Sequence, residues 1–330
     1  MSLPLAVSLG DPAVIGAETI AKSWERRESH ALPPFFVIGE IAAIAAVWDG
    51  PVAAIASPDE AAAAFAHALP VLSLGDGAPV EPGRPTPSGA RLSLDALELA
   101  VGLTRSGAAA AVVTGPVSKT QLYGIGFAHP GQTEFVAERC GIAADKVAMM
   151  LAGPTLRAVP VTTHIPLADV SAALTTERIV ARGRVVIRGL KRQFGIARPR
   201  LAVAGLNPHA GENGALGRED IDIIAPAVER LRAEDEADVT GPLSADTMFH
   251  ARARAGYDAA LCMYHDQALI PLKALHFDEG VNITLGLPIV RTSPDHGTAF
   301  DIAGKGIADP SATIAAIALA ASCARRMAAG

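Results

Sequence analysis

The chain contains few cysteines, and their spacing excludes a disulfide-stabilised scaffold. Only Cys140, Cys262 and Cys323 occur in 330 residues, and no two of them form a CxxC pair. Small secreted domains that depend on disulfides carry a dense and usually even set of cysteines. We therefore expect buried thiols in a reducing compartment, and we predict a cytoplasmic protein.

Net positive charge and long hydrophobic runs are also lacking. The formal net charge is −6, whereas a nucleic-acid surface needs clustered lysine and arginine to contact phosphates. The apolar tract 312–324 is shorter than the roughly 20 residues that cross a bilayer. Asp11, Pro12 and Glu18 interrupt any signal-peptide pattern at the N-terminus. We expect neither nucleic acid nor a membrane as a partner.

Several common cofactor and metal fingerprints are absent from the sequence. Two short glycine motifs, at 124–126 and 304–306, both lack the third glycine of GxGxxG. There is no P-loop and no HExxH motif either. A standard Rossmann cofactor site is therefore not expected, nor is a site of the P-loop or zincin type.

What the sequence does contain is an alternation of apolar runs and helical patterns. Half of the residues are hydrophobic and 19% are charged, which is typical of a packed globular protein. The expected strands are 3–9, 35–39, 109–113, 147–151, 156–161, 200–206 and 259–263, and the expected long helices are 15–26, 93–106, 176–194 and 311–327. Such alternation predicts an α/β fold, either as two domains or as one large unit.

Three histidines follow directly on predicted strands. They are His164, His209 and His265. Three neutral imidazoles that meet at strand ends would bind a divalent metal and leave positions open for substrate oxygens. The histidines are far apart in sequence, so the pattern leaves their convergence open. For His265 alone, an ordinary core histidine is an equally good interpretation.

The segment 262–301 adds two cations and a neutral donor to His265. Lys273 and Arg291 carry the charges and Asn282 lies between them, which suits a substrate phosphate or carboxylate. The residues alone therefore predict an α/β enzyme that uses a metal on a small phosphorylated or carboxylated molecule.

Eight motifs, in order along nearly the whole chain, resemble the PdxA family of 4-hydroxythreonine-4-phosphate dehydrogenases. They are GDPAVIGAE, TGPVSK, PGQTEF, VTTHIPL, GLNPHAGE, GPLSADT, MYHDQ and GVNITLGLPIVRTSPDHGTAFDIAG. The long motifs are highly specific when they occur together. The resemblance implies a fold like that of isocitrate and isopropylmalate dehydrogenases, with two α/β/α lobes and a cleft between them. It also implies that 1–125 with 295–330 form the first lobe, and that 126–294 form a second lobe with most metal and substrate residues.

The same resemblance implies a set of site residues. His164, His209 and His265 match the family's metal ligands, which are shared between the two subunits of a homodimer. The implied ion is zinc, magnesium or cobalt. The implied substrate contacts are Gln132, Thr133, Lys273, Asn282 and Arg291, and Lys273 and Asp246 are the expected catalytic residues. Asp246 and Asp266 are expected to support the histidines through hydrogen bonds. The cofactor is NAD or NADP, bound without the glycine fingerprint, and its contacts are not identified.

The implied reaction is oxidation of 4-(phosphooxy)-L-threonine at C3 to a β-keto acid. Loss of carbon dioxide then gives 3-amino-2-oxopropyl phosphate in the biosynthesis of pyridoxal phosphate. The metal would lower the pKa of the C3 hydroxyl as hydride leaves for nicotinamide.

The sequence departs from the family pattern at two places. Gln132 stands where the family usually has histidine, and Val14, Gly16, Ala17 and Glu18 replace its usual first-turn motif. Glutamine cannot carry a positive charge, so this departure bears on the substrate more than on the reaction type. The alternatives are a paralogue acting on another phosphorylated four-carbon hydroxy acid or on a cis-dihydrodiol, and a phosphate acyltransferase-like enzyme.

Overall fold

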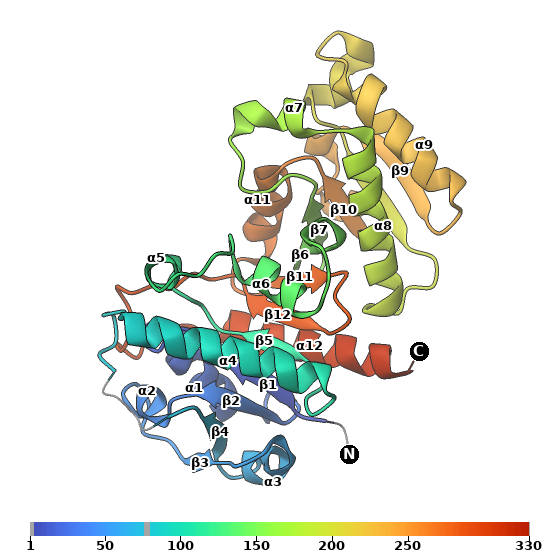
Figure 1. The fold of residues 1–330 in the computed structure, drawn as a ribbon. Coiled ribbons are helices and arrows are strands. Elements are labelled where there is room, and N and C mark those ends of the chain that lie inside the picture. Colours follow the sequence, from blue (N-terminus) through green and yellow to red (C-terminus); the bar gives the residue numbers. More distant parts are fainter. Residues whose placement is uncertain (1–2, 76–79, 330) are drawn as a thin grey trace. The chain divides into compact units, whose positions relative to one another are not determined.

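The computed structural model describes residues 3–75 and 80–329, and it confirms a mixed α/β fold (Figure 1). The chain divides into two compact units. Unit 1 contains Met1–Gly141 and Leu287–Arg325, and unit 2 contains Ile142–Gly286 and Arg326–Gly330. The lobes expected from the sequence have their boundaries at other residues, at 125/126 and 294/295, and that division stays a prediction.

Unit 1 is built on a parallel sheet of buried, apolar strands. Its strand order is β3-β4-β2-β1-β5-β12, and every recorded pairing within it is parallel. The strands are β1 (Leu5–Ser8), β2 (Phe35–Gly39), β3 (Val52–Ala54), β4 (Leu69–Ser73), β5 (Val112–Thr114) and β12 (Arg291–Pro294). Every residue of β1, β2 and β5 is buried. Continuous apolar runs of this kind are typical of parallel strands that are covered on both faces.

Helices of unit 1 connect these strands. They are α1 (Gly16–Glu25), α2 (Ile41–Ala45), η1 (Pro58–Glu60), α3 (Ala61–Phe65), α4 (Pro87–Arg105), α5 (Lys119–Gly124), α6 (Gln132–Arg139) and most of α12 (Ser311–Ala329). The long helix α4 begins where the sequence dictates. Thr86 Oγ1 caps it by accepting from Gly89 N at 3.1 Å, and Pro87 occupies a first-turn position that needs no amide hydrogen.

Helix α12 is apolar but belongs to the core. Among the described residues it is the one helix long and apolar enough to cross a membrane, and 44% of its most apolar stretch is buried. Ile317 and Ala320 are fully buried, and Ala316 O accepts from Thr292 Oγ1 of β12 at 2.9 Å. A buried helix of a soluble protein has the same composition, so α12 is weak evidence for a membrane span.

Unit 2 contains a mixed sheet with the order β11-β6-β7-β10-β8-β9. Strand β6 pairs antiparallel with both β7 and β11, as expected for a hairpin across 153–154. Strands β7, β10, β8 and β9 are parallel neighbours. The strand bounds are β6 (Ala148–Ala152), β7 (Arg157–Pro160), β8 (Arg200–Ala204), β9 (Asp238–Leu243), β10 (Ala259–Cys262) and β11 (Val281–Leu285).

The helices of unit 2 include two long ones and several short turns. They are η2 (Ala144–Lys146), η3 (Leu167–Asp169), α7 (Val170–Ala173), α8 (Thr176–Arg192), η4 (Pro208–Gly214), η5 (Asp220–Ile224), α9 (Ala225–Ala233), η6 (Ala245–Thr247), α10 (Ala251–Arg254) and α11 (His265–His276). Because β7, β10 and β8 are parallel neighbours, the segments that follow them leave from the same edge of the sheet. Those segments carry the three histidines identified from the sequence.

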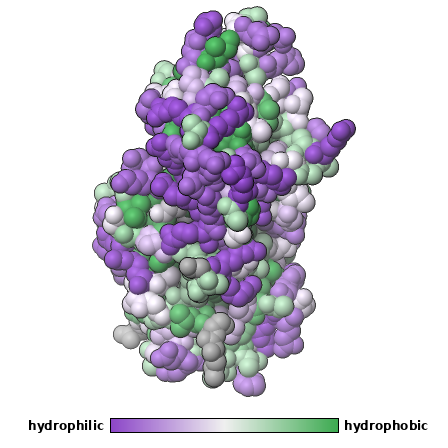
Figure 2. All heavy atoms as spheres, turned by 90° about the vertical axis from the view of Figure 1, so that its right-hand side faces the viewer, coloured by the Kyte–Doolittle hydropathy of each residue, from purple (hydrophilic) through white to green (hydrophobic). Residues whose placement is uncertain are grey.

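The outer surface is mixed in character. On the face that Figure 2 presents, hydrophobic residues lie in separate groups among hydrophilic ones. The exposed large hydrophobic residues of the described chain include Ile165, Leu167, Leu216 and Ile221, which lie close in sequence to His164 and His209. Single exposed apolar residues are common on protein surfaces, so none of these four needs a special explanation by itself.

Candidate active site

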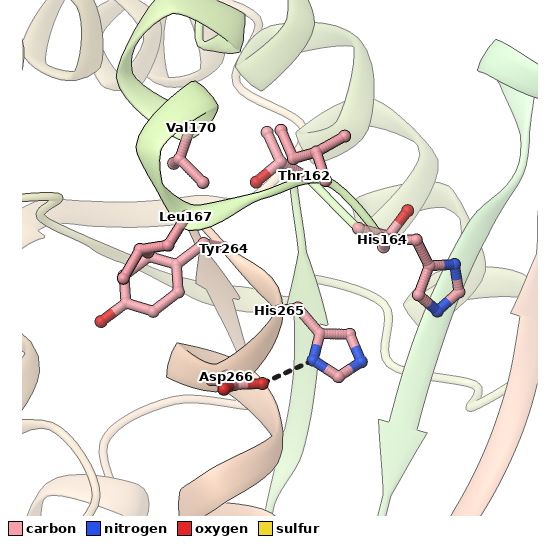
Figure 3. Close-up of a pocket in the computed structure, with 9 residues that line it drawn as sticks. Thr162, His164, Leu167, Val170, Tyr264, His265 and Asp266 are labelled. Atoms are coloured by element: carbon pink, nitrogen blue, oxygen red, sulfur yellow. Dashed lines mark hydrogen bonds and ion pairs between the residues drawn. The ribbon is translucent and has the colours of Figure 1, made fainter.

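His164 and His265 lie together in unit 2. His164 follows β7, and His265 is the first residue of α11, directly after β10. The two strands are parallel neighbours, with Val159 opposite Leu261. The imidazole centroids are 5.6 Å apart with an angle of 45° between the ring planes (Figure 3). The structure therefore brings two of the three predicted histidines together.

Backbone hydrogen bonds hold the segments that carry these rings. The carbonyl oxygen of Met263 accepts from both Thr162 N at 3.2 Å and Thr162 Oγ1 at 2.8 Å. His164 itself has φ of 38°, a positive value that is uncommon for residues other than glycine, although histidine adopts it more often than most. Strained backbone of this kind occurs at functional sites where the surrounding structure holds it in place.

A pocket of about 230 Å³ surrounds the two rings. It is lined by residues of the segments that follow β7 and β10: Thr162, Thr163, His164, Ile165, Leu167, Val170, Tyr264, His265 and Asp266. Figure 3 labels Leu167 and Tyr264 among the residues that line this pocket together with the two imidazoles. An apolar pocket with a few convergent polar groups is the usual form of a small-molecule site.

Asp266 orients His265. The Nδ1 atom of His265 lies 2.7 Å from Asp266 Oδ1. In the tautomer in which Nδ1 donates to this carboxylate, Nε2 keeps its lone pair for a metal ion. Two metal-bound imidazole nitrogens each lie about 2.1 Å from the ion, which puts ring centroids roughly 5–6 Å apart. The observed spacing fits a pair of ligands to one divalent ion.

His209 lies in a different place in the same unit. It belongs to η4, which follows β8, and it lies close enough to Asp246 of η6 to affect that carboxyl electrostatically. The Ser244 hydroxyl donates to Asp246 Oδ1 at 2.5 Å. This hydrogen bond lowers the pKa of the Asp246 carboxyl, and the nearby His209 ring adds to the lowering. Across 3–75 and 80–329, no three His, Cys, Asp or Glu side chains of one chain gather into a metal site.

A buried arginine forms a second polar group, in unit 1. Arg291, at the start of β12, is 3% exposed. Its guanidinium donates to Thr114 Oγ1 at 2.7 Å, to Gln132 Oε1 at 3.2 Å and to Thr133 Oγ1 at 3.4 Å. Burial lowers the pKa of Arg291 to about 10, and Glu134 opposes that shift. The side chain therefore remains charged at neutral pH.

The N-terminus of α6 faces this guanidinium. Gln132 and Thr133 are the first residues of the helix, and Gln132 Nε2 also donates to Gly115 O at 3.2 Å. A cation, a hydroxyl and a helix N-terminus at one place favour binding of an anionic group. Thr114 was not predicted as a site residue, although it directly follows an apolar run at the start of the TGPVSK motif.

Lys273 and Asn282 lie in unit 2, on α11 and β11. Lys273 Nζ is 5.6 Å from the centroid of the Phe277 ring. Asn282 Oδ1 is buried and has no hydrogen-bond partner among the described residues. A buried acceptor without a donor costs free energy, and a ligand hydroxyl or ammonium group would supply the missing hydrogen bond.

Comparisons with known proteins give a consistent result. The family model described as pyridoxal phosphate biosynthetic protein PdxA matches residues 33–320. A 4-hydroxythreonine-4-phosphate dehydrogenase from Zymomonas mobilis is 58% identical over 319 residues, which cover 97% of this chain and 95% of that protein.

Solved structures agree with this similarity. The crystal structure of 4-hydroxythreonine-4-phosphate dehydrogenase from Klebsiella pneumoniae is similar with a TM-score of 0.86 and 39% identity, covering 98% of this chain and all of that one. A terephthalate 1,2-cis-dihydrodiol dehydrogenase from Burkholderia xenovorans is less similar, with a TM-score of 0.66, 29% identity and 98% of both chains covered.

Proposed function

Because the chain belongs to the PdxA family, we propose that it is the dehydrogenase that oxidises 4-(phosphooxy)-L-threonine at C3 with NAD or NADP. The product is a β-keto acid that loses carbon dioxide to give 3-amino-2-oxopropyl phosphate, a step in pyridoxal phosphate biosynthesis. The observation that carries the proposal is the His164–His265 pair, whose rings lie 5.6 Å apart in one pocket. The location that we propose is the cytoplasm.

His164 and His265 would hold a divalent ion, with His209 of a partner subunit as the third ligand. When bound, zinc, magnesium or cobalt would act as a Lewis acid on the C3 hydroxyl and lower its pKa. Among residues 3–75 and 80–329 of one chain, no three His, Cys, Asp or Glu side chains gather into a metal site, and this supports a shared site. We therefore propose a homodimer, and the exposed Leu167 and Leu216, at 71% and 47%, give a second copy apolar surface to cover.

Arg291 supports recognition of an anionic end of the substrate. It is buried and charged, and it lies against the first residues of α6. We propose that Arg291, Thr133 and Gln132 bind a phosphate or carboxylate there. Lys273 and Asn282 are proposed as further substrate contacts. Asn282 Oδ1 is buried and accepts no hydrogen bond from any described residue, so a substrate group could donate to it.

Oxidation at C3 removes a hydride from carbon and a proton from the hydroxyl group. Bound NAD or NADP would supply the acceptor for this hydride. We propose Lys273 and Asp246 as the groups that handle the proton. The hydrogen bond from Ser244 lowers the pKa of the Asp246 carboxyl, so this group is ionised at neutral pH and has an oxygen free of its own proton.

The second candidate is a dehydrogenase of a cis-dihydrodiol, as the likeness to the Burkholderia xenovorans protein suggests. Gln132 favours this second candidate, because a neutral amide at this position offers a substrate phosphate no additional positive charge. Gln132 Oε1 accepts from Arg291, whereas a protonated histidine at this position would place a second positive charge beside the guanidinium. Compared with such a histidine, a neutral glutamine binds a phosphate less strongly by about 1 kcal/mol, which is several-fold in affinity.

The test is the absorbance at 340 nm after mixing protein, a divalent metal and NAD or NADP with each substrate. We expect reduced cofactor with 4-(phosphooxy)-L-threonine, and a higher kcat/KM for it than for a cis-dihydrodiol. The same comparison in Gln132→His measures what the amide contributes to substrate choice. Efficient turnover of the diol together with no turnover of the phosphorylated substrate would refute the assignment to vitamin B6 biosynthesis.

A further inference from the structure

The segment that carries His209 has an unusual backbone. Six consecutive residues have positive φ: His209 (52°), Ala210 (51°), Gly211 (81°), Glu212 (44°), Asn213 (54°) and Gly214 (94°). Gly211 and Gly214 adopt positive φ without a steric penalty, because they have no Cβ. Each of the other four costs free energy, because Cβ approaches the following carbonyl oxygen. Other contacts must therefore hold the segment in this form.

The side chain that anchors the residues leading into this segment is Asp220. It is 1% exposed and begins η5. Its Oδ1 accepts from Leu206 N at 2.8 Å, and its Oδ2 accepts from Asn207 N at 3.2 Å and from Asn207 Nδ2 at 3.0 Å. Both carboxylate oxygens thus accept hydrogen bonds from Leu206 and Asn207, the residues that lead into the left-handed segment.

Two glycines leave room for this carboxylate. A Cβ on Gly205 would lie 2.5 Å from Asp220 Oδ1, and a Cβ on Gly211 would lie 3.2 Å from Asp220 Oδ2. The carboxylate is therefore enclosed between the end of β8 and the left-handed segment. Glu219 also fixes the Asn207 side chain, because Glu219 Oε2 accepts from Asn207 Nδ2 at 2.8 Å.

A buried glutamine, Gln267, connects the end of β8 with the segment that carries His265. Gln267 Nε2 donates to Gly205 O at 2.8 Å, and its Oε1 accepts from Met263 N at 2.6 Å. Gln267 lies two residues after His265 on α11. The base of the left-handed segment is therefore joined by hydrogen bonds to the strand end from which His265 emerges.

We propose that Asp220 is a positioning residue: it holds residues 209–213 in the left-handed conformation and so presents the His209 imidazole before any ion binds. The inference rests on the proposed function, in which His209 is a metal ligand. Without Asp220 the segment would relax towards ordinary backbone conformations, and each binding event would have to restore the strained form. Metal affinity would fall, while binding of the anionic substrate end by Arg291 would not change.

The experiment uses full-length protein and Co²⁺ as the probe. The variants are Asp220→Asn and Asp220→Ala, with Asp222→Ala as the matched control, because Asp222 lies in the same short helix, is exposed and pairs only with Arg218 among the described residues. The measurements are the Co²⁺ dissociation constant, the intensity of the Co²⁺ absorption bands, and amide hydrogen exchange of 206–213 in metal-free protein.

We expect the Co²⁺ dissociation constant to rise on the order of 100-fold in Asp220→Ala and about 10-fold in Asp220→Asn, the range found for residues that support metal ligands. Asparagine keeps one acceptor oxygen, so it should rescue part of the affinity. Exchange at 206–213 should quicken in the same order, and saturating Co²⁺ should restore most of kcat. Asp222→Ala should match the native protein throughout.

Two results would overturn the inference. If both Asp220 variants bind Co²⁺ normally and exchange 206–213 at the native rate, Asp220 only stabilises the fold. If His209→Ala also keeps native Co²⁺ affinity, the proposed ligand set itself fails. Loss of Co²⁺ in His209→Ala combined with normal binding in the Asp220 variants refutes the positioning role alone.

Discussion

The ring centroids of His164 and His265 lie 5.6 Å apart, although the two residues follow different strands, β7 and β10. Parallel pairing of β7 with β10 and the hydrogen bonds from Thr162 to Met263 O bring them together. This relationship gives the first prediction, in His164→Ala. We expect kcat/KM to fall at least about 100-fold with loss of tightly held metal, because one ligand is removed.

The control for His164→Ala is His250→Ala. His250 caps α10, where its Nδ1 accepts from Ala253 N at 3.3 Å, and it lines no part of the pocket. Metal content measured by atomic emission should stay native in the control. Native metal content and turnover in His164→Ala would show that this imidazole is not a ligand.

A second prediction concerns removal of the metal. If the site uses histidines of two subunits, metal binding and assembly are coupled. Treatment with a chelator should therefore raise the dimer dissociation constant, and adding back the ion should restore it. Sedimentation velocity over a range of concentrations measures this change. An unchanged dimer, or a monomer that retains stoichiometric metal, would contradict the shared site.

A third prediction concerns the fork geometry of Arg291. Its guanidinium donates to Thr114 and Gln132 through one nitrogen and to Thr133 through another, which a lysine ammonium cannot reproduce. In Arg291→Lys we expect KM for the phosphorylated substrate to rise about 10- to 100-fold, corresponding to roughly 1.5–3 kcal/mol for charge-assisted hydrogen bonds. Arg218→Lys, on the exposed surface, should leave KM unchanged.

A fourth prediction compares two glycines inside long helices. A Cβ on Gly189 of α8 would lie 2.9 Å from both δ-carbons of Leu285, whereas a Cβ on Gly102 of α4 would meet nothing within 4 Å. We expect Gly102→Ala to stabilise the protein by about 0.5–1 kcal/mol. Gly189→Ala should destabilise it by about 1 kcal/mol, because overpacking exceeds the gain in helix propensity. Urea unfolding measures both; equal shifts would contradict this packing.

A fifth prediction follows from His276. Its Nε2 lies 2.8 Å from Thr155 Oγ1 and accepts from Thr155 N at 3.3 Å, so the ring is neutral there. Burial lowers the pKa of His276 below its ordinary value of 6.5, and the charge of Arg254 adds to this while Glu279 opposes it. The unfolded chain therefore binds the proton more readily, and stability present above about pH 6.5 is lost as the pH falls through the folded pKa.

His276→Gln removes this titrating group and keeps an acceptor for Thr155 N. The free energy of unfolding should therefore fall less in the variant than in the native protein between about pH 7.5 and pH 5. Urea titrations at both ends of that range measure the difference. An equal fall in both proteins would mean that His276 does not contribute.

The sequence by itself was sufficient for the local elements and the class of fold. The apolar run 35–39 is strand β2, the run 259–263 contains β10, and the helical pattern 176–194 contains α8. These segments are predictable because hydrophobic periodicity and capping act between residues close in sequence. The eight ordered motifs likewise identified the family from local sequence alone.

Only the tertiary structure decided which side chains meet. His164, His209 and His265 look equivalent in the sequence, yet the rings of His164 and His265 lie together while His209 neighbours Asp246. Pairing of β7 with β10 places the segments of His164 and His265 side by side, and such pairing results from long-range packing that no local pattern records. The left-handed backbone of 209–213 was equally hidden, because its cost is offset by the buried carboxylate of Asp220, which follows later in the chain.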